Sequence, residues 1–126
     1  MVNQVLLQPQ EIEVFYIIPT LKKNLAVCMK ANGLKQNKIA EILQTEKATV
    51  SHYINNKRGN KIQFDDYVLE EIPKSASGIT DKLSLLKETQ RLLRFIRSSG
   101  QLCKIHKQLS NIPGECSPEV VNCFGE

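Results

Sequence analysis

Two short amphipathic segments, separated by only three residues, limit what this chain can fold into more than any other feature does. The segments are residues 34–43 and 47–55, and residues 44–46 join them. Each has apolar residues at helical spacing: Ile39, Ala40 and Leu43 in the first, and Val50, Tyr53 and Ile54 in the second. So short a connection predicts two helices packed closely against each other, which is a helix-turn-helix.

The remaining residues also show helical periodicity, so we predict an all-α fold. Pro9 suits the first turn of a helix, and Pro19 should then kink or restart it. Beyond Pro19, one helical face carries apolar residues until Gly33 ends the helix: Leu21, Leu25, Cys28 and Met29. The predicted architecture is a helix-turn-helix bundle followed by a helical C-terminal region. This region is expected to mediate dimerisation and contains most of the cysteines.

A domain boundary is predicted at residues 73–78, PKSASG, because Pro, Ser and Gly are typical of linkers. This linker would separate a helix-turn-helix domain, residues 1–72, from a helical region, residues 79–126. A short helix with an acidic cluster is expected over residues 62–72.

The helix expected after this linker has a wide apolar surface. Thr80 should cap it, and it should run to about Ser98, where Gly100 closes it. Its apolar arc consists of Leu83, Leu85, Leu86, Leu92, Leu93, Phe95 and Ile96. Such an arc fits either a central core helix or a dimer interface. We predict a homodimer through this helix.

The charge distribution favours an acidic partner. The 126 residues carry a net charge of +4, and 41% of them are hydrophobic, enough to build a core. Cations concentrate around the two short segments: Lys35, Lys38, Lys47, Lys57, Arg58 and Lys61. No apolar run approaches the roughly 20 residues that span a bilayer, and the first residues do not resemble a secretion signal. We therefore expect a soluble, cytoplasmic protein with no membrane partner.

The two short helices have the residues that a DNA-binding helix-turn-helix needs. The predicted partner is therefore double-stranded DNA. In such a motif the first helix braces the second, whose N-terminal residues reach base edges in the major groove. Ala40 is small enough for the helix crossing, and Val50 and Tyr53 can anchor the second helix. The candidates for base contacts are Lys47, Ala48, Thr49, Ser51 and His52, and those for phosphate contacts are Gln36, Asn55, Lys57 and Arg58. A plain helical hairpin explains each feature singly but the set poorly.

The C-terminal region contains a possible metal site. Cys103 and His106 lie three residues apart on a predicted helix, 101–109, and therefore share a face. Together with Cys116 and Cys123 they would give the four ligands of a zinc site or an iron–sulfur cluster. The loose spacing of the last two also allows buried thiols, or a disulfide between them. Cys28, alone on an apolar face, is expected to be a core residue.

The stretch LKQNKIAEILQTEKATVSHYINNKRG, residues 34–59, resembles the repressor-like helix-turn-helix of the XRE class. The residues that carry the resemblance are Gln36, Ile39, Ala40, Val50, Ser51, Tyr53, Lys57, Arg58 and Gly59. A narrower resemblance, to small archaeal predicted transcriptional regulators with a C-terminal cysteine region, adds VFYIIPTLKKNLAVCMK and SSGQLCKIH. It covers most of the chain and implies a sequence-specific regulator.

The chain departs from the family pattern in two regions. Gln44 replaces the usual turn glycine, so a left-handed conformation there would cost about 1 kcal/mol. Glu46 replaces the usual capping Thr, and Thr45 could cap the helix instead. In the cysteine region, Glu119 replaces one expected cysteine, and Gln90 and Leu93 lie near the positions of earlier ones. These losses favour zinc over an iron–sulfur cluster.

We therefore expect a transcriptional regulator, responsive to a metal or to redox conditions, and not an enzyme. His52 and His106 have no evident nucleophile partner in the sequence. The alternative is a protein-interaction module with a structural zinc site, in which the helix-turn-helix has only a supporting role.

Overall fold

The computed structural model of the chain describes residues 6–55 and 62–109, and these residues form helices without any strand. The elements in order are α1 (Pro9–Ile12), the π-helix η1 (Glu13–Ile17), α2 (Ile18–Ala31), α3 (Gln36–Leu43), α4 (Lys47–Ile54), α5 (Asp66–Ala76), α6 (Lys82–Ser98) and α7 (Gln101–Leu109). The predicted all-α bundle is confirmed. No helix of the described part has the length and apolar character required to cross a membrane.

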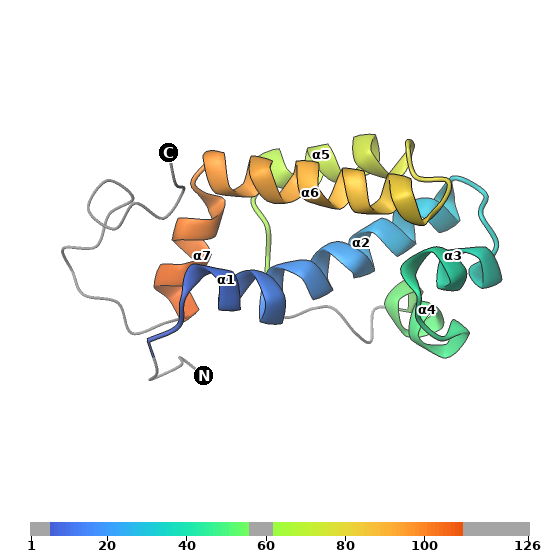
Figure 1. Cartoon of the computed structure of the whole chain (residues 1–126), viewed down its shortest axis with the longest axis horizontal. Helices are drawn as coiled ribbons and strands as arrows, with labels where there is room; N and C mark the ends of the chain where they lie inside the picture. The colour runs from blue at the N-terminus through green and yellow to red at the C-terminus, as the bar shows by residue number, and fades with distance from the viewer. Residues whose placement is uncertain (1–5, 56–61, 110–126) are drawn as a thin grey trace.

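The helices form an elongated bundle with different elements at its two ends (Figure 1). α2 runs along the middle and contacts α3, α4 and α5, while α5 also packs against α6. The α3–α4 pair lies at one end of the bundle, and α7 lies at the other, against α1 and α6. The short helix pair is therefore held by the long helices from one side only.

The expected interruption at Pro19 takes the form of a π-helical turn. α1, η1 and α2 follow one another directly, so that residues 9–31 are helical throughout. Pro19 has no N–H for the preceding turn, and its ring displaces the carbonyl four residues earlier. The wider turn of η1, immediately before it, accommodates that displacement.

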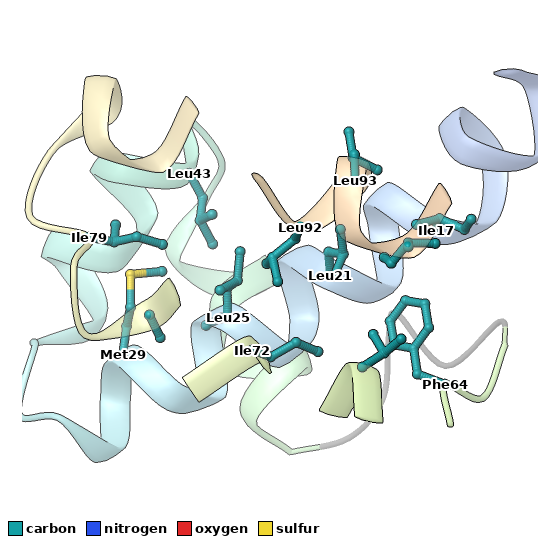
Figure 2. Packing of buried hydrophobic residues seen from close by; sticks show 14 of the residues in the cluster. Ile17, Leu21, Leu25, Met29, Leu43, Phe64, Ile72, Ile79, Leu92 and Leu93 are labelled. Atoms are coloured by element: carbon teal, nitrogen blue, oxygen red, sulfur yellow. The ribbon is translucent and has the colours of Figure 1, made fainter. Parts of the chain in front are cut away.

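One hydrophobic core joins the parts of the chain that the sequence assigned to two domains. It includes Leu21 and Leu25 from α2, Val50 from α4, and Leu92 from α6, each fully buried. Figure 2 shows Leu92 directed toward the side chains of Leu21 and Leu25. Residues on either side of the predicted linker therefore bury the same apolar surface.

The predicted linker at residues 73–78 is wrong over most of its length. Residues 73–76 form the last turn of α5, and Pro73 lies inside that helix. Ser75 and Ala76 are buried, with 1% and 2% of their surface exposed. The small side chains that resemble a linker in the sequence instead allow α5 to pack closely against α6. The acidic helix expected over residues 62–72 begins four residues later than predicted, at Asp66.

The cap of α6 is also one residue later than predicted. Asp81, not Thr80, is the N-cap, and its Oδ1 accepts a hydrogen bond from the Ser84 N–H at 2.8 Å. The Ser84 hydroxyl accepts from the Asp81 N–H at 3.0 Å, which completes a capping box.

Charged side chains hold α6 to its neighbours. Arg97 donates from Nε and Nη2 to the two carboxylate oxygens of Glu13, at 2.7 and 3.0 Å. Arg91 donates to Glu71 Oε1 at 3.0 Å and to the Ser75 hydroxyl on α5. These bonds fix α6 against η1 and α5 in addition to the apolar contacts.

α7 connects the first residues of the bundle with the start of α5. The buried side chain of Gln101 accepts a hydrogen bond from the Asp65 N–H at 2.7 Å, and Lys104 pairs with the Asp65 carboxylate at 2.9 Å. His106 makes a hydrogen bond through Nε2 to the Leu7 carbonyl. The helix therefore has fixed partners on two other segments.

Candidate nucleic-acid interface

The turn between α3 and α4 has the conformation expected from the sequence. Gln44 adopts the left-handed region, with φ 56° and ψ 47°, in the position where the motif that the sequence resembles has glycine. The N–H of Thr45 donates to the Ala40 carbonyl at 3.0 Å, which closes the end of α3. Ala40 is 7% exposed, and its small side chain allows the two helices to approach. The turn thus sets the angle between α3 and α4.

One side of α4 is an anchor in the core. Val50 is fully buried, while Tyr53 and Ile54 pack against the core with part of their surface exposed. The helix contacts α2 and α3 along this side. The opposite side of α4 has no covering element in the described part of the chain.

The predicted base-contacting residues differ in exposure. Lys47 and Ala48, at the start of α4, are exposed, whereas Thr49, Ser51 and His52 are half-buried. Of the five candidates for base contacts, the first two are therefore the most exposed. α4 packs against both α2 and α3, and its exposure is greatest at Lys47 and Ala48.

The structure also settles which residue precedes α4. Glu46 is the N-cap, in extended conformation, and its side chain accepts no capping hydrogen bond. The alternative cap, Thr45, lies one residue too early. The first N–H groups of α4 are therefore not satisfied by a side-chain cap.

The predicted phosphate contacts lie at both ends of the helix pair. Gln36 is the first residue of α3 and is half-buried, and Asn55 is the exposed residue that follows α4. The amide nitrogen of Asn55 donates to the Ser51 hydroxyl at 3.4 Å. Lys57 and Arg58 lie outside the described residues.

A basic pocket of about 270 Å³ opens where the end of α2 meets the starts of α3 and α4. Its lining consists of Lys30, Lys35, Gln36, Asn37 and Lys47. The sequence assigned contact roles to Gln36 and Lys47, included Lys35 only in the local excess of cations, and gave no role to Lys30 or Asn37. Lys30, Lys35 and Asn37 flank the turn at Gly33, and only the folding of that turn brings them near Lys47. This pocket is hereafter called the lysine pocket.

Two of the four predicted metal ligands lie in the described part of the chain. Cys103 is partly exposed, and His106 is 8% exposed, on α7. Because Nε2 of His106 already contacts the Leu7 carbonyl, Nδ1 is the ring nitrogen left for a metal. Cys116 and Cys123 lie outside the described residues, and within those residues no group of three candidate metal ligands occurs.

The remaining cysteine of the described part is in the position expected of a core residue. Cys28 packs partly buried against the core, and this burial raises the pKa of its thiol. A raised pKa disfavours the reactive thiolate. Cys28 is therefore a packing residue and not a candidate ligand or nucleophile.

The apolar arc of α6 is divided between the core and the surface. Leu92, Leu93 and Ile96 are buried, and Leu85 and Phe95 are partly buried against the core. Leu83 and Leu86 are 73% and 58% exposed. The C-terminal half of the arc therefore packs into the core of this chain. Leu83 and Leu86, in the N-terminal half of α6, are exposed, and this part is hereafter called the open half of α6.

The α3–α4 end of the bundle combines an exposed helix start with a concentration of cations. Ammonium and amide groups on such a surface are complementary to anions with several oxygens. Comparisons with protein families, with curated proteins and with solved structures found no match to the chain.

Proposed function

We propose that this protein is a sequence-specific DNA-binding transcriptional regulator that inserts the start of α4 into the major groove. The observation that carries the proposal is the polarity of α4. Val50 is fully buried beneath the helix, while Lys47 and Ala48 project from its first turn. In proteins that read DNA with this motif, that turn is the part that reaches base edges.

The neighbouring residues support a division between base reading and phosphate contact. Lys47 can donate to a guanine, and the hydroxyl of Ser51 and the ring of His52 can reach a base edge where their surface is exposed. Gln36 and Asn55, at opposite ends of the helix pair, can donate to phosphates, as can Lys57 and Arg58. Phosphate contacts would fix the position of α4, and its first turn would select the sequence.

The protein is proposed to act as a homodimer. Leu83 and Leu86 are large apolar residues on the open half of α6, more exposed than any other large apolar side chain of the described part. A second copy would cover them and present two reading helices, about one DNA turn apart, to a symmetric site.

A zinc ion is proposed for the C-terminal region, held by Cys103, His106, Cys116 and Cys123. Histidines that bind zinc commonly donate their other ring N–H to a carbonyl, which is the arrangement of His106 with Leu7. Thiolate ligands would make the site responsive to oxidation, because an oxidised cysteine no longer binds the metal.

Selection of bound fragments from random duplex DNA tests the proposed function. The wild-type protein is expected to enrich a defined sequence, and its affinity should fall steeply with salt. Lys47→Ala and His52→Ala should each relax preference at discrete positions, by about 1–3 kcal/mol. Lys57→Ala with Arg58→Ala should weaken all duplexes similarly. A wild-type protein that enriches no sequence and shows no salt-dependent binding would refute the proposal.

A further inference from the structure

We propose that the lysine pocket is a phosphate-binding site in which Lys30, Lys35 and Lys47 share one phosphate group. The inference rests on the proposed function, because the backbone phosphate of a bound duplex is the source that the geometry favours. It extends that function by assigning a role in phosphate binding to Lys30, Lys35 and Asn37, which lie outside α4, the helix proposed to read bases. The pocket would be the contact that sets the depth and register of α4.

The lining of the lysine pocket is basic. Three lysines and two residues with side-chain amides line a hollow of about 270 Å³, and no acidic residue lines it. The amides of Gln36 and Asn37 add neutral hydrogen-bond donors. A group of donors without an opposing acid is complementary to an anion with several oxygens.

The three lysines of the pocket take no part in ion pairs within the described part of the chain. Other lysines there form ion pairs, such as Lys38 with Glu41, at 3.2 Å, and Lys74 with Glu71, at 3.0 Å. Lys30, Lys35 and Lys47 form no ion pair with any residue from 6–55 or 62–109. An anion in the pocket would therefore provide the opposite charge that these three residues lack there.

The lysine pocket lies next to the start of α4. Lys47 belongs both to the lining and to the first turn of α4, so an anion in the pocket lies beside the predicted reading surface. The N-cap of α3 is Lys35, whose side chain has no acceptor for a capping hydrogen bond, so the first N–H groups of α3 add to the favourable field. A free phosphate ester could satisfy the same donors, and its binding would compete with DNA.

The proposal is tested by replacing Lys30 and Lys35, the two pocket lysines that lie outside α4. The variant Lys30→Gln/Lys35→Gln is compared with Arg94→Gln/Lys107→Gln, which removes the same charge from exposed residues on α6 and α7. Binding to the selected duplex is measured over a range of salt concentrations. Loss of one shared phosphate should lower the salt slope by about 0.9 and the affinity at 0.1 M salt by about eightfold. Two independent contacts would instead lower the slope by about twice as much.

A second arm uses inorganic phosphate without DNA, monitored by the backbone NMR signals of Gln36 and Asn37. Shifts that saturate in the wild type and vanish in Lys30→Gln/Lys35→Gln would identify a site for free phosphate. A reduced salt slope without such shifts would identify the backbone of the duplex as the source. The proposal is overturned if both double variants have the same salt slope and phosphate causes no shift. If the wild type does not bind DNA at all, the proposed function fails, and the NMR titration with inorganic phosphate alone decides whether the lysine pocket binds phosphate.

Discussion

Arg97 on α6 and Glu13 in η1 form a two-point ion pair, with Nε to Oε2 at 2.7 Å and Nη2 to Oε1 at 3.0 Å, although 84 residues separate them in sequence. Glu13 is 5% exposed and has no other charged partner in the described part of the chain. The pair therefore neutralises a carboxylate that the fold places in the interior, where an unpaired charge is costly.

Arg97→Ala should lower the free energy of unfolding by about 2 kcal/mol, because it leaves the carboxylate of Glu13 without its donors. The estimate is at the low end for buried pairs because the Arg97 side chain is 38% exposed. Urea denaturation measures the change. Arg94→Ala, on the exposed face of the same helix, is the control and should change stability little. Equal losses in the two variants would show that the pair contributes nothing specific.

The stability of the bundle should fall on acidification through the ion pairs of Glu71. Hydrogen bonds from Lys74 and Arg91 lower the pKa of Glu71, so its folded pKa lies below its unfolded value. A lowered pKa gives stability that is present above the unfolded value, about 4.3, and is lost as pH falls through the folded value. Glu71→Gln should flatten this acid loss in a series of thermal melts. Glu70→Gln, an exposed neighbour, should retain it; identical profiles for both variants would contradict the assignment.

Gln44→Gly should stabilise the protein by about 0.5–1 kcal/mol. The left-handed conformation at φ 56° is strained for a residue with a Cβ atom and is free of strain for glycine. The greater freedom of glycine in the unfolded chain offsets part of the gain. Calorimetry should show a melting temperature higher by about 3 °C. Gln44→Ala keeps the Cβ atom and should give no such increase, and an equal gain there would refute the explanation.

The proposed homodimer should depend on Leu83 and Leu86, on the open half of α6. Light scattering is expected to give twice the chain mass for the wild type and the single-chain mass for Leu83→Glu/Leu86→Glu, because charges would replace the buried apolar contact. The control is Gln90→Glu, an exposed position on the same helix. A monomeric wild type, or a double variant that remains dimeric, would remove α6 as the interface.

Protein purified without chelator should contain about one equivalent of zinc, with every thiol free under denaturing conditions. Cys103→Ser should lower the zinc content, whereas Cys28→Ser should not, since Cys28 packs against the core. Two thiols missing from the count, without zinc, would instead indicate a disulfide between Cys116 and Cys123.

Short-range features of the fold could be predicted from the sequence, and features that depend on packing could not. The three-residue turn and the left-handed Gln44 follow from spacing and from local backbone preferences. The linker prediction failed because small residues such as Ser75 and Ala76 are equally typical of flexible turns and of closely packed helices. Their burial depends on α6, and no local pattern reveals it.

In the candidate site, too, local features could be predicted from the sequence and features that depend on packing could not. The exposed start of α4 follows from the helical periodicity around Val50. The grouping of Lys30 and Lys35 with Lys47 could not be predicted, because it depends on how α2 ends and α3 begins. The partial burial of Ser51 and His52 likewise depends on how α4 packs against other helices, which the sequence does not specify.

The bonds of α7 also determine the order in which the bundle can be completed during synthesis. α3 and α4 contact each other and α2, which are near neighbours in sequence, so most of their contacts become possible early in synthesis. The bond from His106 to Leu7 spans 99 positions, and that from Gln101 to Asp65 spans 36. Until residues 101–109 have emerged, the first helix lacks a covering partner at this end. The growing chain therefore carries its α3–α4 pair for some time before the opposite end of the bundle can close.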